Sequence, residues 1–108
     1  MKRPQASAVL ISAPDIETAE RIGRVLVEER LAASANAVPG VRSVYRWRGA
    51  VQEASEALLV VKTGSARVQA LAARVRDLHP YELPAVVALP LVDGSAAYLD
   101  WIVAESSE

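Results

Sequence analysis

The chain has 108 residues, which suits one domain and leaves no room for a second core. It is 52% apolar and carries 12 basic against 13 acidic side chains, so we expect a folded globular domain without a general attraction to nucleic acid or to an anionic membrane. The sequence contains no cysteine, which excludes disulfides, thiolate metal sites and a cysteine nucleophile.

The N-terminal part predicts a strand rather than a targeting signal. Residues 8–13 form an apolar, β-branched run of the length of a buried strand. This run is too short for a signal peptide, although Lys2 and Arg3 precede it, and no apolar stretch approaches the ~20 residues of a membrane span. We therefore predict a cytoplasmic protein without a membrane partner, with one domain over residues 1–108 and an ordered core over about 8–104.

A helix is predicted after Pro14, which ends the strand. Asp15 is a typical N-cap, and apolar residues at helical spacing continue from Ile16 to about Leu31. This spacing gives the helix one apolar face for packing on a sheet.

A long hairpin is predicted within residues 33–63. Its first arm alternates between aromatic and basic side chains, its turn falls at Gly49, and its second arm ends in the apolar run 57–61. The Pro-Gly pair at residues 39–40 interrupts the first arm and predicts a bend or a bulge there.

A second helix, a fourth strand and a terminal helix complete the predicted elements. Apolar residues three and four apart predict a helix over residues 68–78, with Thr63 or Ser65 as its cap. The strand candidate spans residues 83–92, and a short helix over 96–104 ends the ordered core.

The predicted order is therefore βαββαβ followed by a helix. Right-handed split βαβ units in this order give an α+β, ferredoxin-like sandwich of four strands with two helices on one face. The fold class by itself says little about function.

Signatures of catalysis and of RNA binding are weak. His79 is the only histidine, no serine stands in a known nucleophile motif and the glycines are isolated, so we predict that the protein is not an enzyme. RNA-binding sheets of this fold stack bases on aromatic residues of the central strands, whereas Tyr45 and Trp47 lie toward a hairpin tip. We therefore predict no nucleic-acid partner.

Several short sequence motifs occur in the same order in a known family, and together they run from about residue 8 to residue 102. They are Ser12-Ala13-Pro14-Asp15, Glu29-Arg30-Leu31-Ala32-Ala33, Val38-Pro39-Gly40-Val41, Ser43-Val44-Tyr45-Arg46-Trp47-Arg48-Gly49, Lys62-Thr63, His79-Pro80-Tyr81-Glu82-Leu83-Pro84 and Tyr98-Leu99-Asp100-Trp101-Ile102. In these motifs the chain resembles the CutA family. The resemblance implies a divalent-cation tolerance protein without an assigned reaction, built as a homotrimer of ferredoxin-like subunits and similar in architecture to the PII signalling proteins.

Departures from the family pattern bear on metal binding. Copper binding in bacterial members is attributed to a cysteine near the end of the first strand and to a histidine pair ahead of the Pro-Tyr motif. The matching positions here are Ile11, Leu78 and His79, and a further frequent cysteine is replaced by Ser34. Since one imidazole cannot make a site alone, the resemblance implies at most weak binding of Cu²⁺ or another divalent cation at His79, with no required cofactor. The alternative is that His79 ends the second helix and hydrogen-bonds a carbonyl there.

A set of polar residues is the candidate for a cleft between subunits. It consists of Glu56, Lys62, His79 and Tyr81. Such a group could hold a small anion, as in a PII-like sensor without a metal role, or it could form a structural network at a subunit boundary.

Large aromatic residues are the candidates for the trimer interface. These are Tyr45 and Trp47 of the hairpin and Trp101 of the terminal helix. For the two hairpin residues, the alternative is ordinary core packing within one subunit.

Overall fold

The computed structural model describes residues 5–108, so the basic residues Lys2 and Arg3 lie outside the described part. Its elements, in chain order, are β1 (Ala6–Ala13), α1 (Ile16–Glu28), β2 (Ser34–Trp47), β3 (Ala50–Gly64), a 3-10 turn (Ser65–Arg67), α2 (Val68–Leu78), β4 (Val86–Pro90) and α3 (Ala96–Glu105).

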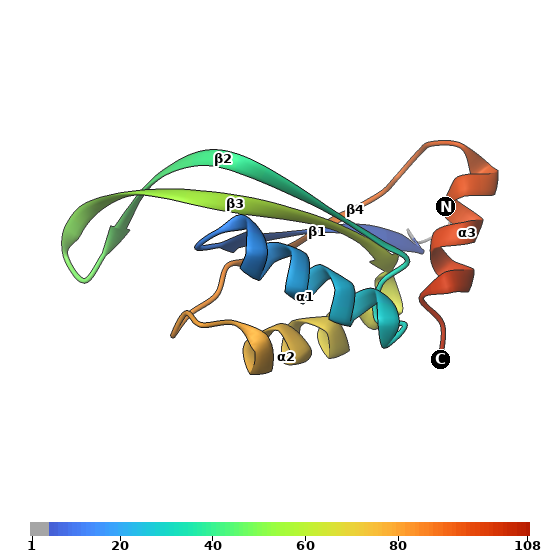
Figure 1. Ribbon diagram of the computed structural model, residues 1–108. Coiled ribbons are helices and arrows are strands. Elements are labelled where there is room, and N and C mark those ends of the chain that lie inside the picture. Colours follow the sequence, from blue (N-terminus) through green and yellow to red (C-terminus); the bar gives the residue numbers. More distant parts are fainter. Residues whose placement is uncertain (1–4) are drawn as a thin grey trace.

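The four strands form one antiparallel sheet in the order β2-β3-β1-β4. Helices α1 and α2 lie on one face of this sheet, and α3 lies at one end of it (Figure 1). Within residues 5–108, neither long helix covers the opposite face, which we call the open face. The βαββαβ order with a terminal helix confirms the predicted ferredoxin-like α+β fold.

The core lies between the sheet and the two long helices because β1 and β3 alternate buried and partly buried side chains. Its largest fully buried residues are Val9, Ile11, Ile22, Leu26, Leu59, Val61, Leu71 and Val75.

The first helix begins at Ile16 as predicted, and it ends at Glu28 instead of near Leu31. The Asp15 side chain accepts a hydrogen bond from the Thr18 N–H at 2.8 Å and caps α1. Gly23 allows α1 to approach the sheet closely, since a Cβ at this position would lie 3.0 Å from the Cβ of Ala35 and 3.2 Å from Leu59 Cδ1.

The hairpin of β2 and β3 extends well beyond the helices (Figure 1). Its turn places Arg48 and Gly49 at φ 51° and 82°, the left-handed values of a two-residue turn. The predicted irregularity at residues 39–40 is confirmed as a register shift between Val38 and Val41, with Gly40 at φ 73°.

The start of α2 differs from the prediction. Neither expected cap serves the helix: the Thr63 hydroxyl donates to the Leu31 carbonyl at 2.8 Å, and the Ser65 hydroxyl lies 2.8 Å from that of Ser7. The 3-10 turn leads into α2 instead, without a side-chain cap. The last strand, β4, is also shorter than the predicted 83–92.

Candidate functional site

Three of the predicted cleft residues meet at the base of the hairpin. The Tyr81 hydroxyl donates to Glu56 Oε2 at 2.5 Å, and the rings of Tyr81 and His79 lie 4.6 Å apart. Glu56 and His79 are only 9% and 8% exposed. A carboxylate on β3 is thus held in a largely buried position by the loop that follows α2.

Both ring nitrogens of His79 are already engaged. Its Nε2 lies 2.7 Å from the Ser12 carbonyl oxygen, and its Nδ1 accepts the Tyr81 N–H at 3.1 Å. This pattern fits a neutral imidazole with its proton on Nε2. The imidazole thus hydrogen-bonds a carbonyl, as in the alternative to metal binding, but that of Ser12 on β1 and not one at the end of α2. A metal ion on either nitrogen would have to displace one of these partners.

Tyr81 acts as a neutral donor toward Glu56. Burial raises the pKa of its phenol well above the ordinary value, and the hydrogen bond to the Glu56 carboxylate raises it further. The phenol therefore keeps its proton at physiological pH and remains available to Glu56.

Lys62 does not join this group within one chain. It lies on the same strand as Glu56 but six residues away, which is about 20 Å along a strand. Its Nζ donates to Asn36 Oδ1 at 3.1 Å and lies 5.8 Å from the centre of the Tyr98 ring. Within one chain, the cluster is therefore Glu56, His79 and Tyr81, and the meeting of all four residues in a cleft between subunits stays a prediction.

The three predicted interface aromatics are all accessible in the single chain. Tyr45 is 44% exposed, Trp47 37% and Trp101 42%, so the alternative of core packing within one subunit does not hold for the hairpin pair. Trp101 stacks on Tyr98 with ring centres 5.5 Å apart. Their role between subunits stays a prediction.

A cavity of about 820 Å³ lies beside Glu56 and Tyr81. Its walls come from β1, β2, β3 and the loop after α2, and they include Ser12, Arg42, Ser43, Tyr45, Trp47 and Glu82. The Arg48–Glu82 ion pair, at 2.7 Å, joins the hairpin tip to this loop, and the Arg48 guanidinium lies 5.3 Å from the centre of the Trp47 ring. Sequence reasoning missed this bridge, because only the folded chain brings residues 48 and 82 together.

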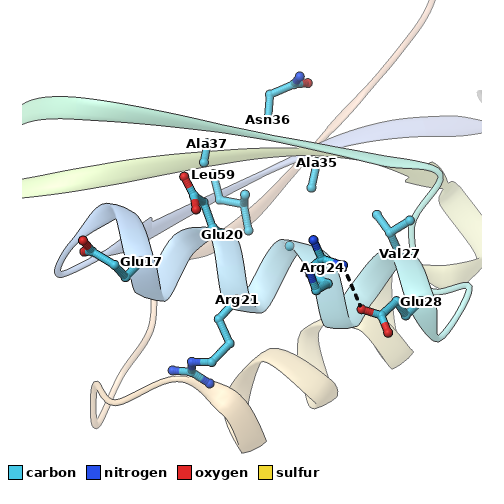
Figure 2. A pocket seen from close by; sticks show the side chains of 11 residues that line it. Glu17, Glu20, Arg21, Arg24, Val27, Glu28, Ala35, Asn36, Ala37 and Leu59 are labelled. Atoms are coloured by element: carbon cyan, nitrogen blue, oxygen red, sulfur yellow. Dashed lines mark ion pairs between the residues drawn. The ribbon is translucent and has the colours of Figure 1, made fainter.

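A second cavity, of about 910 Å³, lies between α1 and β2. Figure 2 shows its side chains: the rim carries charged residues of both signs, with Arg24 and Glu28 paired at 3.7 Å, and Arg21 points away from the sheet. The charged side chains of this rim are exposed. This second cavity therefore has a solvated rim with charges of both signs, and none of these charged side chains is buried.

The residues of one chain do not fit a tight metal site. Residues 5–108 contain no group of three or more histidine, aspartate or glutamate side chains arranged to hold a metal ion. With the His79 imidazole engaged on both sides as well, the geometry that could hold a divalent cation is incomplete in a single subunit.

The strand order and the helix placement define a ferredoxin-like α+β protein with a protruding hairpin. Residues 7–105 match the family model described as "CutA1 divalent ion tolerance protein". The chain belongs to this family.

Individual relatives agree with this assignment. The "Divalent-cation tolerance protein CutA" of Thermus thermophilus is 52% identical over 94 residues, which are 87% of this chain and 91% of that protein. "Protein CutA" of Homo sapiens is 44% identical over 96 residues, which are 89% of this chain but 54% of that protein. The chain thus spans about half the length of the human relative.

Solved structures show the same fold. The divalent cation tolerance protein (Cut A1) from Thermus thermophilus has a TM-score of 0.92 and 48% identity, over 94% of this chain and 99% of that one. CutA from Xylella fastidiosa has a TM-score of 0.91 and 40% identity, over 95% and 99%.

Proposed function

We propose that this protein acts in divalent-cation tolerance as a homotrimer that binds divalent cations, Cu²⁺ among them, only weakly and catalyses no reaction. The family match over residues 7–105 is the observation that carries the cation role. The incomplete ligand set around His79 is the reason to expect weak binding.

The trimer is taken from the family resemblance, and the exposed surface supports an assembly. The open face and the hairpin leave large apolar side chains accessible, among them Val44, Val51, Val87 and Leu89. Strands β2 and β4 form the two edges of the sheet and have no further strand partner within residues 5–108. Bare edges are aggregation hazards that neighbouring subunits would cover.

Sedimentation velocity and copper calorimetry test this proposal. We expect a particle of three times the 11.5 kDa chain mass at micromolar concentration, and a copper affinity in the micromolar range or weaker that falls further in His79→Ala. A monomer at that concentration would contradict the assembly. A nanomolar copper site that survives His79→Ala would contradict the ligand assignment.

The alternative of a PII-like anion sensor has less support. Within one chain, Lys62 lies away from the cluster, and the buried charge beside the cavity is the negative Glu56 carboxylate. No helix within residues 5–108 has the length and apolar character to span a membrane. We propose a cytoplasmic location, although relatives include a CutA named chloroplastic in Arabidopsis thaliana and one titled periplasmic from Archaeoglobus fulgidus.

A further inference from the structure

The cavity at the hairpin base combines one buried negative charge with aromatic walls. Glu56 is 9% exposed and uses Oε2 to accept the Tyr81 hydroxyl. Tyr45, Trp47 and Tyr81 line the same space. A volume of about 820 Å³ is in the range of small-molecule sites.

The other charges around this cavity are engaged elsewhere. Glu82 pairs with Arg48 at 2.7 Å, and the Arg42 guanidinium, which also lines the cavity, donates to the neutral Ser55 hydroxyl. Within residues 5–108, Glu56 has no ion pair. A carboxylate that is taken out of water without an ion-pair partner favours the approach of a positive group.

Aromatic faces favour the same sign of charge. The negative face of an indole or phenol ring attracts a cation within about 6 Å. The chain already uses this attraction once, since the Arg48 guanidinium lies 5.3 Å from the centre of the Trp47 ring. The walls and the buried charge therefore select for a ligand that is positive at one end and apolar at the other.

We propose that this cavity binds a small organic cation, a primary ammonium on an aromatic or aliphatic body, with Glu56 as its charge partner. The ammonium N–H groups donate to the carboxylate of Glu56, and the apolar body packs on Tyr45 and Trp47. A primary ammonium suits this site better than a divalent metal ion, because one carboxylate and aromatic rings do not complete a metal coordination shell. This inference goes beyond the proposed function, which places the weak cation site at His79 and assigns no ligand to this cavity.

Three probes of similar size and different charge test the inference. They are 2-phenylethylamine, 2-phenylethanol and phenylacetate, titrated at pH 7 in the presence of EDTA and followed by calorimetry and by the indole N–H signal of Trp47 in ¹⁵N–¹H spectra. We expect the amine to bind about tenfold or more tightly than the alcohol, in line with a charge-assisted hydrogen bond to a buried carboxylate. The Trp47 signal should shift more than that of Trp101.

Substitutions test whether Glu56 supplies the charge that selects the amine. Glu56→Gln keeps the size of the side chain and should abolish the preference for the amine over the alcohol. Glu53→Gln is the matched control, because Glu53 lies on the same strand, is exposed and does not line the cavity. Tyr45→Leu should weaken the binding of amine and alcohol alike by about threefold, because the aromatic body of both probes loses its ring–ring packing. If Glu56→Gln does not fold, the comparison of the three probes on the unchanged protein still decides.

Several results would overturn the inference. Equal affinity for amine and alcohol, or a preference for phenylacetate, would show that the negative charge does not select the ligand. Absence of amine binding together with a weaker trimer in Glu56→Gln would assign the carboxylate to a basic side chain of a neighbouring subunit. Sedimentation and copper titration of the same preparation test the proposed function separately. A trimer that binds copper weakly and does not bind the amine would refute only the ligand class proposed for the cavity.

Discussion

The hydrogen bond between Tyr81 and Glu56 makes the sharpest prediction for stability. Its length is 2.5 Å and its acceptor is a carboxylate that is only 9% exposed. Hydrogen bonds to charged groups contribute about 1.5–3 kcal/mol, and removing the donor also leaves the buried carboxylate less satisfied. Tyr81→Phe should therefore lower the free energy of unfolding by about 2 kcal/mol per subunit, measured by guanidinium titration at fixed protomer concentration.

The pH dependence of stability tests the same bond independently. Burial and the Glu56 carboxylate raise the pKa of the Tyr81 phenol in the folded state above the ordinary value near 10. Below pH 10 both states hold the proton, and the stabilisation is fully present. Above pH 10 the unfolded chain loses this proton while the folded chain keeps it, so stability falls as pH rises.

The magnitude of that slope follows from one proton. Between about pH 10 and 11, the unchanged protein should lose about 1 kcal/mol more than Tyr81→Phe does, because the unfolded phenol is about half deprotonated at the start of this range and almost fully deprotonated at its end. Tyr98→Phe removes the hydroxyl of an exposed tyrosine and should keep the profile of the unchanged protein. Equal slopes for the unchanged protein and Tyr81→Phe, or a loss below about 0.5 kcal/mol at neutral pH, would refute the reasoning.

Other substitutions probe the assembly, the packing and the helix start. Trp47→Ala should weaken the trimer by about 3 kcal/mol if the ring is buried between subunits, and an unchanged sedimentation profile would assign it to free surface. Gly23→Ala should lower stability by about 1–3 kcal/mol in melts, because its Cβ would lie 3.0 Å from that of Ala35, and a neutral result would mean that α1 shifts freely. Asp15→Ala should lower the melting temperature at pH 7, whereas Asp15→Asn should keep the cap there. The cap hydrogen bonds lower the pKa of Asp15, so the stabilisation by the cap is present above about pH 4 and is lost as pH falls below that value. Asp15→Asn should not show this loss of stability in acid. A pH profile of the variant like that of the unchanged protein would contradict the assignment.

Features that depend on a few neighbouring residues could be predicted from the sequence. The Asp15 cap, the irregularity at residues 39–40 and the turn at Gly49 each follow from local backbone and side-chain preferences. The order of strands and helices followed from the periodicity of apolar residues, and the antiparallel sheet of β2-β3-β1-β4 agrees with it.

Features that depend on packing between distant elements could not be predicted. The Thr63 hydroxyl donates to the Leu31 carbonyl instead of capping α2, and His79 meets the Ser12 carbonyl although the two residues are 67 positions apart in the sequence. The separation of Lys62 from Glu56 within one chain could have been predicted from the sequence, since six residues of extended strand already place them about 20 Å apart.

The bulge at residues 39–40 connects the local prediction to the candidate site. Directly opposed residues of antiparallel strands share a face, so Val38 lies on the face of Leu58 and Val41 on the face of Glu56. Leu58 and Glu56 are two apart on β3 and share one face, which means that Val38 and Val41 also share it although they are three apart.

The extra residue in β2 therefore inverts the alternation of the outer part of the hairpin. Tyr45 and Trp47, which pair with Gln52 and Ala50, come to lie on the same face as Glu56. In a regular strand the arginines at 42, 46 and 48 would occupy that face instead, and the buried carboxylate would meet cations of its own chain. The position of one bulge thus decides whether Tyr45 and Trp47 or a row of arginines shares the face of Glu56, and with it the charge of the ligand that this face favours.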